Sequence, residues 1–209
     1  MVVGITYLCH TLKNMMADLL NTNRKIVLAI TGASGSIYAN KLLQRLIGLE
    51  DPLKEIAVIF SETGREIWKS EIGSEFHNQG AEKEYDNSKF NAPFASGSSQ
   101  YDTMIICPAS MGSIGRIANG TSDDLIARTA DVMLKERRRL IIVPREAPYN
   151  LIHINNMKLL TLAGAIICPA SPSFYSNPKT IDDLIMTLVD RIIDLAGFDG
   201  NGFRWMTND

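Results

Sequence analysis

The stretch KIVLAITGASGSIYANKLLQRLI, residues 25–47, decides the class of fold. Its first six residues are mostly apolar and β-branched, as in a strand buried on both faces. After the turn T-G-A-S-G, apolar residues recur with helical spacing at Ala39, Leu42, Leu43, Leu46 and Ile47. The stretch therefore predicts a strand, a tight turn and a helix, the opening unit of a nucleotide-binding α/β domain.

Strand-like and helix-like segments alternate along the rest of the chain. Further strands are predicted at 55–60, 101–108, 140–144 and 165–169, with a short edge strand within 72–92. Further helices are predicted at 63–73, 122–138, 151–162 and 181–195. Ser122 precedes two acids and is the expected N-cap of its helix. This alternation indicates a Rossmann-like, three-layer α/β/α fold with a mostly parallel sheet.

The composition indicates one globular domain with a sizeable core. The chain has 209 residues, of which 45% are hydrophobic, and a formal net charge of −2. It has neither a long Lys/Arg run nor an apolar run of membrane-spanning length, which disfavours nucleic acid and membrane partners. Residues 1–24 lack the features of a signal peptide and are interpreted as an N-terminal extension of unknown role. Residues 25–209 are interpreted as a single domain.

The cysteines point to a reducing compartment and away from a metal site. Cys9, Cys107 and Cys168 lie far apart, with no C-x-x-C and no histidine at ligand spacing. The pattern suggests neither a disulfide framework nor a zinc site, and a cytoplasmic location fits it best.

The opening turn has only part of a dinucleotide fingerprint. Gly32 and Gly35 are present, but Tyr38 stands where a dehydrogenase would prefer a further glycine. Ser61 ends the second strand, where an acid would hold the ribose of NAD. The pattern therefore weakens NAD as the ligand but still suits a phosphate or an aromatic ring. The alternative is a purely structural turn with Ser34 as the N-cap.

Small and hydroxylated residues also gather at other strand ends. The segments are PFASGSSQ (93–100), CPASMGSIGRIANG (107–120) and CPASPSFYSNP (168–178). Because the carboxyl ends of parallel strands share one edge, such loops would leave room there for a flat ligand. The alternative is ordinary turn chemistry.

A charged loop, VPREAPYN (143–150), follows another strand. Arg145 offers a planar fork for a phosphate, and Glu146 could carry a proton to a leaving oxygen. The alternative is a surface loop with a local ion pair.

Together these motifs resemble the UbiX family of flavin prenyltransferases. The stretches LKERR, VPREAP and PASPSFY carry the resemblance, which runs from about Lys25 to Arg191. It implies a metal-independent enzyme of ubiquinone-type pathways that joins the dimethylallyl group of dimethylallyl phosphate to N5 and C6 of reduced FMN. The prenylated FMN would serve UbiD-type decarboxylases. The resemblance also implies a Rossmann-like flavoprotein assembled as a homododecamer, with active sites at subunit interfaces.

The resemblance assigns roles to residues of this chain. Ser34 would handle protons, Glu71 would assist the second bond-forming step, and Glu146 would be the acid. The residues implied at the FMN site are Gly32, Ala33, Ser34, Ser61, Ser110, Ser113 and Arg128. Those implied around the substrate phosphate are Ser98, Ser99, Lys135, Arg145, Tyr175 and Arg191, with Tyr175 also counted as catalytic. Trp205 would correspond to a C-terminal tryptophan of the family.

Three cations around one phosphate would suit ionisation of an allylic C–O bond, because negative charge builds on the departing group. In this scheme the protein needs no covalent nucleophile. Cys107 and Cys168 are therefore interpreted as packing residues.

Two other functions remain as alternatives. An FMN-dependent cysteine decarboxylase of the same fold would need a catalytic histidine and a P-x-M-N-type loop, for which His153 and NNM (155–157) are the nearest match. A non-catalytic flavin carrier would need the flavin loops without the phosphate-binding set.

Overall fold

The computed structural model describes residues 24–49, 53–78, 82–199, 202–204 and 206. The described strands form one six-stranded sheet in the order β3-β2-β1-β4-β5-β6, and every neighbouring pair is parallel. The strands are β1 (Lys25–Ile30), β2 (Glu55–Phe60), β3 (Glu82–Asp86), β4 (Thr103–Ala109), β5 (Arg139–Pro144) and β6 (Ile166–Ile167). The predicted Rossmann-like fold and the edge strand are confirmed.

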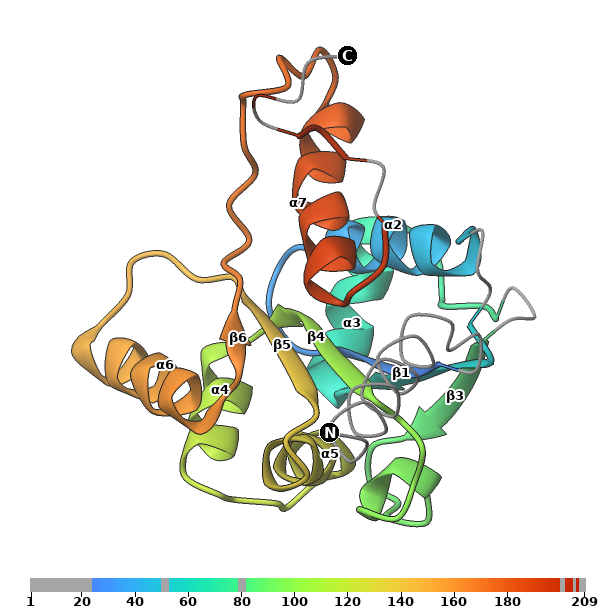
Figure 1. Cartoon of the computed structure of the whole chain (residues 1–209), viewed down its shortest axis with the longest axis vertical. Coiled ribbons are helices and arrows are strands. Elements are labelled where there is room, and N and C mark those ends of the chain that lie inside the picture. Colours follow the sequence, from blue (N-terminus) through green and yellow to red (C-terminus); the bar gives the residue numbers. More distant parts are fainter. Residues whose placement is uncertain (1–23, 50–52, 79–81, 200–201, 205, 207–209) are drawn as a thin grey trace, which may run out of the picture.

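Helices cover both faces of the sheet, as Figure 1 shows. One layer consists of α2 (Ser36–Ile47), α3 (Glu62–Ile72) and α7 (Ile181–Leu195). The other consists of α4 (Met111–Ala118), α5 (Leu125–Lys135) and α6 (Leu151–Ala163), and a 3₁₀ turn, η1 (Pro93–Ala95), precedes β4. Alternate residues of β1 enter the two cores: Ile26 and Leu28 pack with α2 and α7, whereas Val27 and Ala29 pack with α4 and α5.

Some local predictions are wrong. The segment 107–120, predicted as a loop, contains α4. The N-cap of α5 is Asp124, not Ser122, because the Asp124 carboxylate accepts the amide of Ala127 at 2.7 Å. The alternative for the opening turn, with Ser34 as N-cap, does not hold either, because the N-cap of α2 is Gly35, whose φ of 117° favours glycine. The last strand is only two residues long, shorter than the predicted 165–169.

Both described cysteines are packing residues, as predicted. Cys107 and Cys168 are free and buried, and both belong to the core cluster beneath α2 and α7. Burial raises the pKa of each thiol above its ordinary value, which keeps both protonated at neutral pH. The proposed extension, apart from Arg24, lies outside the described residues, and so does Trp205. No helix in the described part of the chain is long and apolar enough to cross a bilayer.

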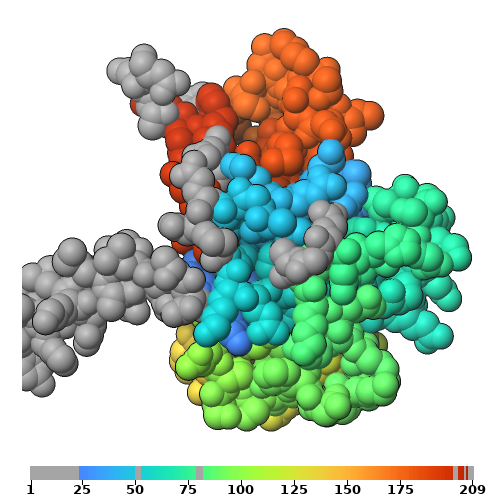
Figure 2. Space-filling model, turned by 90° about the vertical axis from the view of Figure 1, so that its right-hand side faces the viewer, coloured from blue at the N-terminus to red at the C-terminus, as the bar shows by residue number. Residues whose placement is uncertain are grey.

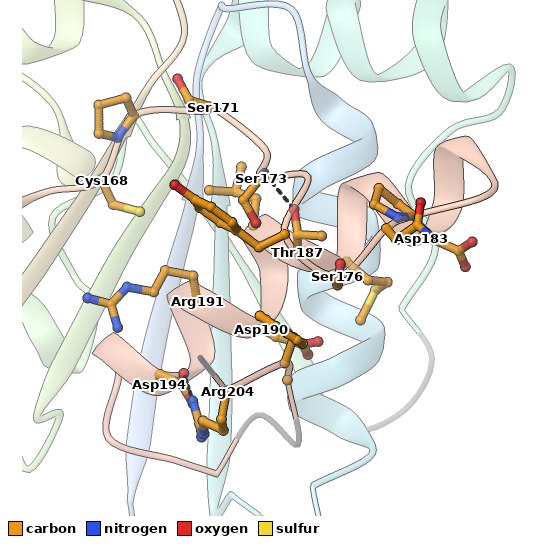
Figure 3. Close-up of a pocket in the computed structure, with 18 residues that line it drawn as sticks. Cys168, Ser171, Ser173, Ser176, Asp183, Thr187, Asp190, Arg191, Asp194 and Arg204 are labelled. Carbon is orange, nitrogen blue, oxygen red and sulfur yellow. Dashed lines mark hydrogen bonds and ion pairs between the residues drawn. The ribbon is translucent and has the colours of Figure 1, made fainter. Parts of the chain in front are cut away.

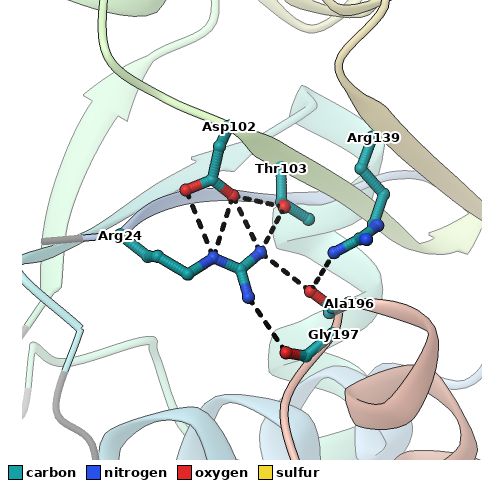
Figure 4. A network of polar contacts seen from close by, with 6 residues as sticks. All are labelled: Arg24, Asp102, Thr103, Arg139, Ala196 and Gly197. Atoms are coloured by element: carbon teal, nitrogen blue, oxygen red, sulfur yellow. Dashed lines mark hydrogen bonds and ion pairs between the residues drawn. The ribbon is translucent and has the colours of Figure 1, made fainter. Parts of the chain in front are cut away.

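An arginine network holds the C-terminal end of α7 against the amino ends of β1, β4 and β5 (Figure 4). The Arg24 guanidinium donates to Asp102 at 2.9 Å, to the Ala196 carbonyl at 2.8 Å and to the Gly197 carbonyl at 3.2 Å. Arg139 donates to the same Ala196 carbonyl. Two cations therefore satisfy carbonyl groups that the end of a helix leaves unpaired.

Candidate active site

The site begins where the sheet order reverses, between β1 and β4. Thr31, directly after β1, donates its hydroxyl to the Pro108 carbonyl at 2.9 Å and accepts the Ser110 amide at 2.7 Å. Thr31 is buried, so these bonds fix the T-G-A-S-G turn beside the start of α4. The reversal point of an open α/β sheet is the usual place for a ligand, because the connections leave the two strands in opposite directions.

Glu71, at the end of α3, holds the turn from the other side. Its carboxylate accepts the amides of Gly35 at 2.9 Å and Ser36 at 2.7 Å. Burial by itself would raise the pKa of Glu71, but hydrogen bonds from the Ser34 hydroxyl and these amides lower it below its ordinary value. The structure thus brings Ser34, the predicted proton-handling residue, into direct contact with Glu71, which was predicted to assist the second bond-forming step.

Hydroxyl groups from two further strand ends lie at the same edge of the sheet. Ser61 caps α3 by accepting the Gly64 amide at 3.0 Å, and the Ser61 amide donates to the end of β1. Ser110 caps α4, with its hydroxyl 3.1 Å from that of Ser113. A Cβ at Gly32 would lie only 2.8 Å from the Thr63 side chain, so this position suits glycine.

Arg128, in the first half of α5, lies against the segment before β4. Its Nε donates to the Ala95 carbonyl at 3.1 Å, and its Nη1 pairs with Asp131 at 2.9 Å. Six of the seven predicted FMN residues therefore share one edge of the sheet, whereas Arg128 ties α5 to η1. The six are Gly32, Ala33, Ser34, Ser61, Ser110 and Ser113.

Lys135, Ser98 and Ser99 form a separate group near the start of β5. Arg138 donates to the Gly97 carbonyl at 2.5 Å and approaches the Ser99 hydroxyl at 3.4 Å. A Cβ at Gly97 would lie 2.8 Å from Lys135 Nζ, so this loop and the end of α5 are in close contact. The group lies where β4 and β5 begin, at the opposite edge of the sheet from the turn.

Two of the three predicted phosphate-binding cations, Lys135 and Arg145, do not meet within one chain. Lys135 precedes β5 and Arg145 follows it, and the six residues of β5 span roughly 20 Å. The Arg145 amide donates to the Ala109 carbonyl at 3.3 Å, which places its loop at the carboxyl edge. Glu146 accepts the Ala147 amide at 3.0 Å, and the side chains of both Arg145 and Glu146 are exposed. Among the described ion pairs, none joins Arg145 to Glu146.

Tyr175 and Arg191 line a pocket between α7 and the segment that follows β6 (Figure 3). Its volume is about 1090 Å³. The segment projects from the body of the domain, in orange in Figure 2, and Tyr175 is 73% exposed. Arg191 lowers the pKa of Cys168, although burial outweighs this effect. The pocket therefore combines a cation, a phenol and several serine hydroxyls.

Three residues at these places had no predicted role. Thr31 bridges two strand ends, and its signal was a hydroxyl directly after a buried strand. Arg138 fixes the loop of Ser99, and its signal was the run of arginines at 137–139. Tyr38 packs against Gly35, and burial and Cys107 raise its pKa while Arg145 lowers it. In the described residues, no group of three or more His, Cys, Asp or Glu side chains could hold a metal ion.

The fold and the hydroxyl-lined edge define a flavin-binding α/β protein, and the Flavoprotein family model matches residues 17–194. Flavin prenyltransferase UbiX of Methanocaldococcus jannaschii is 43% identical over 186 residues, covering 88% of this chain and 99% of that protein. The chain belongs to the UbiX family of flavin prenyltransferases, which confirms the resemblance in its sequence.

Solved structures agree with this assignment. The crystal structure of AnUbiX (PadA1) in complex with FMN and dimethylallyl pyrophosphate is 39% identical, with a TM-score of 0.82, and the match covers 90% of this chain and 100% of that chain. A dodecameric FMN-dependent UbiX-like decarboxylase from Escherichia coli O157:H7 is 32% identical, with a TM-score of 0.80, and the match covers 88% and 100%.

Proposed function

We propose that this chain transfers a dimethylallyl group from dimethylallyl phosphate to N5 and C6 of reduced FMN, releasing phosphate and prenylated FMN. The observation that carries the proposal is the presence of two kinds of site in one chain. A hydroxyl-lined edge at the β1–β4 reversal suits a flavin. Arg145, Tyr175 and Arg191 add groups for a phosphate, which neither flavin storage nor cysteine decarboxylation requires.

The residues at the carboxyl edge fit FMN by their chemistry. Gly32 and Ala33 place no bulky side chain at the turn, which suits a flat ring. The hydroxyls of Ser34, Ser61 and Ser110 suit the polar ribityl chain and ring heteroatoms of a flavin. When bound in reduced form, FMN would supply the nucleophilic N5 and C6 positions.

The chain's own groups would assist departure of the phosphate. Arg145, Arg191 and Lys135 would stabilise the negative charge that builds on its oxygens as the allylic C–O bond breaks. Glu146, when protonated, would donate a proton to the leaving oxygen. Tyr175 would donate a hydrogen bond to the same group. The Ser34 hydroxyl, paired with the ionised Glu71 carboxylate, would relay a proton at the flavin edge.

We propose that the phosphate site is completed by a neighbouring subunit. Lys135, Ser98 and Ser99 lie at the edge opposite to Arg145, so a second copy must supply one of the two groups. Apolar surface supports such contacts, since Leu151 is 71% and Ile152 69% exposed on α6. A homododecamer in the cytoplasm, passing prenylated FMN to a UbiD-type decarboxylase of ubiquinone biosynthesis, is the assembly and role we assign.

Mass spectrometry of the flavin tests the reaction. The protein is incubated anaerobically with reduced FMN and dimethylallyl phosphate, and in parallel with the pyrophosphate. A flavin heavier by one isoprenyl unit is the expected product. Unmodified, tightly bound FMN would instead indicate a flavin carrier or a cysteine decarboxylase, and failure to bind FMN would overturn the assignment.

Glu146→Gln tests the assigned acid. This variant should bind FMN normally but transfer the prenyl group slowly, because its amide cannot donate a carboxyl proton. Glu66→Gln, which changes an exposed acid on α3, is the matched control and should be as active as the parent. Normal turnover by Glu146→Gln would show that another group protonates the phosphate.

A further inference from the structure

The C-terminal residues 202–204 form one wall of the pocket that contains Tyr175 and Arg191. Gly202, Phe203 and Arg204 line this pocket together with residues of α7 and of the segment after β6 (Figure 3). Phe203 adds an apolar ring to a pocket that is also lined by the apolar Met186 and Leu188 and by hydroxyl and charged groups. The shape of the pocket therefore depends on where these residues are held.

A forked ion pair holds Arg204 on α7. Its guanidinium donates through Nη2 to Asp194 Oδ1 at 2.9 Å and through Nη1 to the other oxygen of the same carboxylate. The Asp194 side chain is only 16% exposed, and Asp199 adds a contact at 3.3 Å. Paired, parallel hydrogen bonds from an arginine fix direction as well as distance. Asp194 lies one helical turn after Arg191, so the pair sits directly beside the predicted phosphate ligand.

A second contact fixes the same segment independently. A Cβ at Gly202 would lie 2.7 Å from Cβ of Asp190, so the backbone there packs directly on the helix. Asp190 is held in turn by Arg45 of α2, with Nε 3.4 Å from Oδ1. Residues 202–204 thus touch α7 both before and after Arg191.

We propose that the Asp194–Arg204 pair is a positioning device for the prenyl donor. It seats Phe203 as the apolar wall beside Arg191, where the pocket would take the hydrocarbon part of an allylic phosphate whose charged end meets Arg191 and Tyr175. Asp194 and Arg204 act through the wall and through Arg191, and neither is a catalytic residue. This inference rests on the proposed function, because it assigns a ligand class to the same pocket.

Steady-state kinetics with dimethylallyl phosphate test the device. Asp194→Asn and Arg204→Ala should each raise KM for the donor about 5-fold with kcat nearly unchanged, because they weaken binding and leave the reacting groups in place. The affinity for FMN should stay the same. The double variant with Asp194→Arg and Arg204→Asp should restore KM, since it rebuilds the pair in reverse. Asp182→Asn removes another α7 acid, paired with Lys41 at 2.7 Å, and should change nothing.

A second measurement is independent of turnover. Trypsin can cut after Arg204, and intact-mass analysis detects the loss of residues 205–209. Cleavage should be several-fold faster in Asp194→Asn than in the parent or in Asp182→Asn. If Asp194→Asn is cleaved faster but the parent transfers no prenyl group, the proposed function is overturned, while the role of the ion pair in holding residues 202–204 is kept. Unchanged KM and unchanged cleavage in Asp194→Asn would overturn the inference, as would a double variant no better than its single variants.

Discussion

Replacing Gly64 by alanine should loosen the contact between α3 and the turn of the candidate site. Gly64 is buried, and a Cβ there would lie 2.5 Å from the carbonyl oxygen of Ile30 and 3.0 Å from the Ser61 hydroxyl. Both neighbours are held by backbone bonds, so α3 must move away from β1. Overpacking of this kind costs about 1–3 kcal/mol, and the higher helix propensity of alanine offsets about 1 kcal/mol. The net loss of unfolding free energy is thus up to about 2 kcal/mol.

A thermal-unfolding assay without flavin measures this effect. One kcal/mol shifts Tm by roughly 2–4 °C in a domain of this size, so Gly64→Ala should unfold up to roughly 8 °C earlier. Since α3 also carries Glu71, FMN should bind more weakly. Gly112→Ala is the matched control, because that helical glycine has no atom within 4 Å of its Cβ position. Its Tm should stay the same or rise. A Gly64→Ala variant as stable as Gly112→Ala, with unchanged FMN affinity, would refute the reasoning.

Three further predictions concern the contacts that hold the edges of the sheet. Because hydrogen bonds lower the pKa of Glu71, its contribution to stability is present above about pH 4.5 and is lost as pH falls through its folded pKa. Glu71→Gln should therefore lower Tm at pH 7, and the Tm difference from the parent should shrink as the pH falls through that folded pKa. Arg24→Ala should lower the unfolding free energy, measured with urea, by about 2 kcal/mol, whereas Lys54→Ala, at an exposed position, should lower it by less than about 0.5 kcal/mol. Equal losses in the two variants would contradict the stabilising role of the arginine network. Thr31→Val should lower the unfolding free energy by about 1–3 kcal/mol and weaken FMN binding, measured by urea unfolding and by FMN titration. Thr31→Ser keeps the bridging hydroxyl and should therefore keep both the stability and the FMN affinity of the parent.

The sequence was sufficient for the main elements of the fold because their patterns are strong. Strands β1, β2 and β4 are continuous apolar runs, and α7 has a clear helical period between a capping threonine and its end. The observed bounds of these three strands and of α7 therefore lie within a few residues of the predicted bounds. The short helix α4 was missed because Gly112 and Gly115 interrupt its pattern, and glycine-rich segments are typical of loops.

The local groups of the site were predicted better than their arrangement. Motifs placed the turn residues at one edge, and their contacts through Thr31 and Glu71 agree with that. Lys135 and Arg145 are only ten positions apart, yet a whole strand separates them in space. The number of residues between Lys135 and Arg145 does not predict this distance, because the distance depends on the direction in which α5 and β5 run.

The placement of Lys135 and Arg145 at opposite ends of β5 also has a genetic consequence. If each phosphate site draws one group from each of two neighbouring chains, a chain lacking Lys135 and a chain lacking Arg145 carry complementary defects. Mixed assemblies of two individually inactive variants would then contain some intact sites and regain activity. An organism expressing both alleles would therefore keep a share of the function that neither allele provides alone.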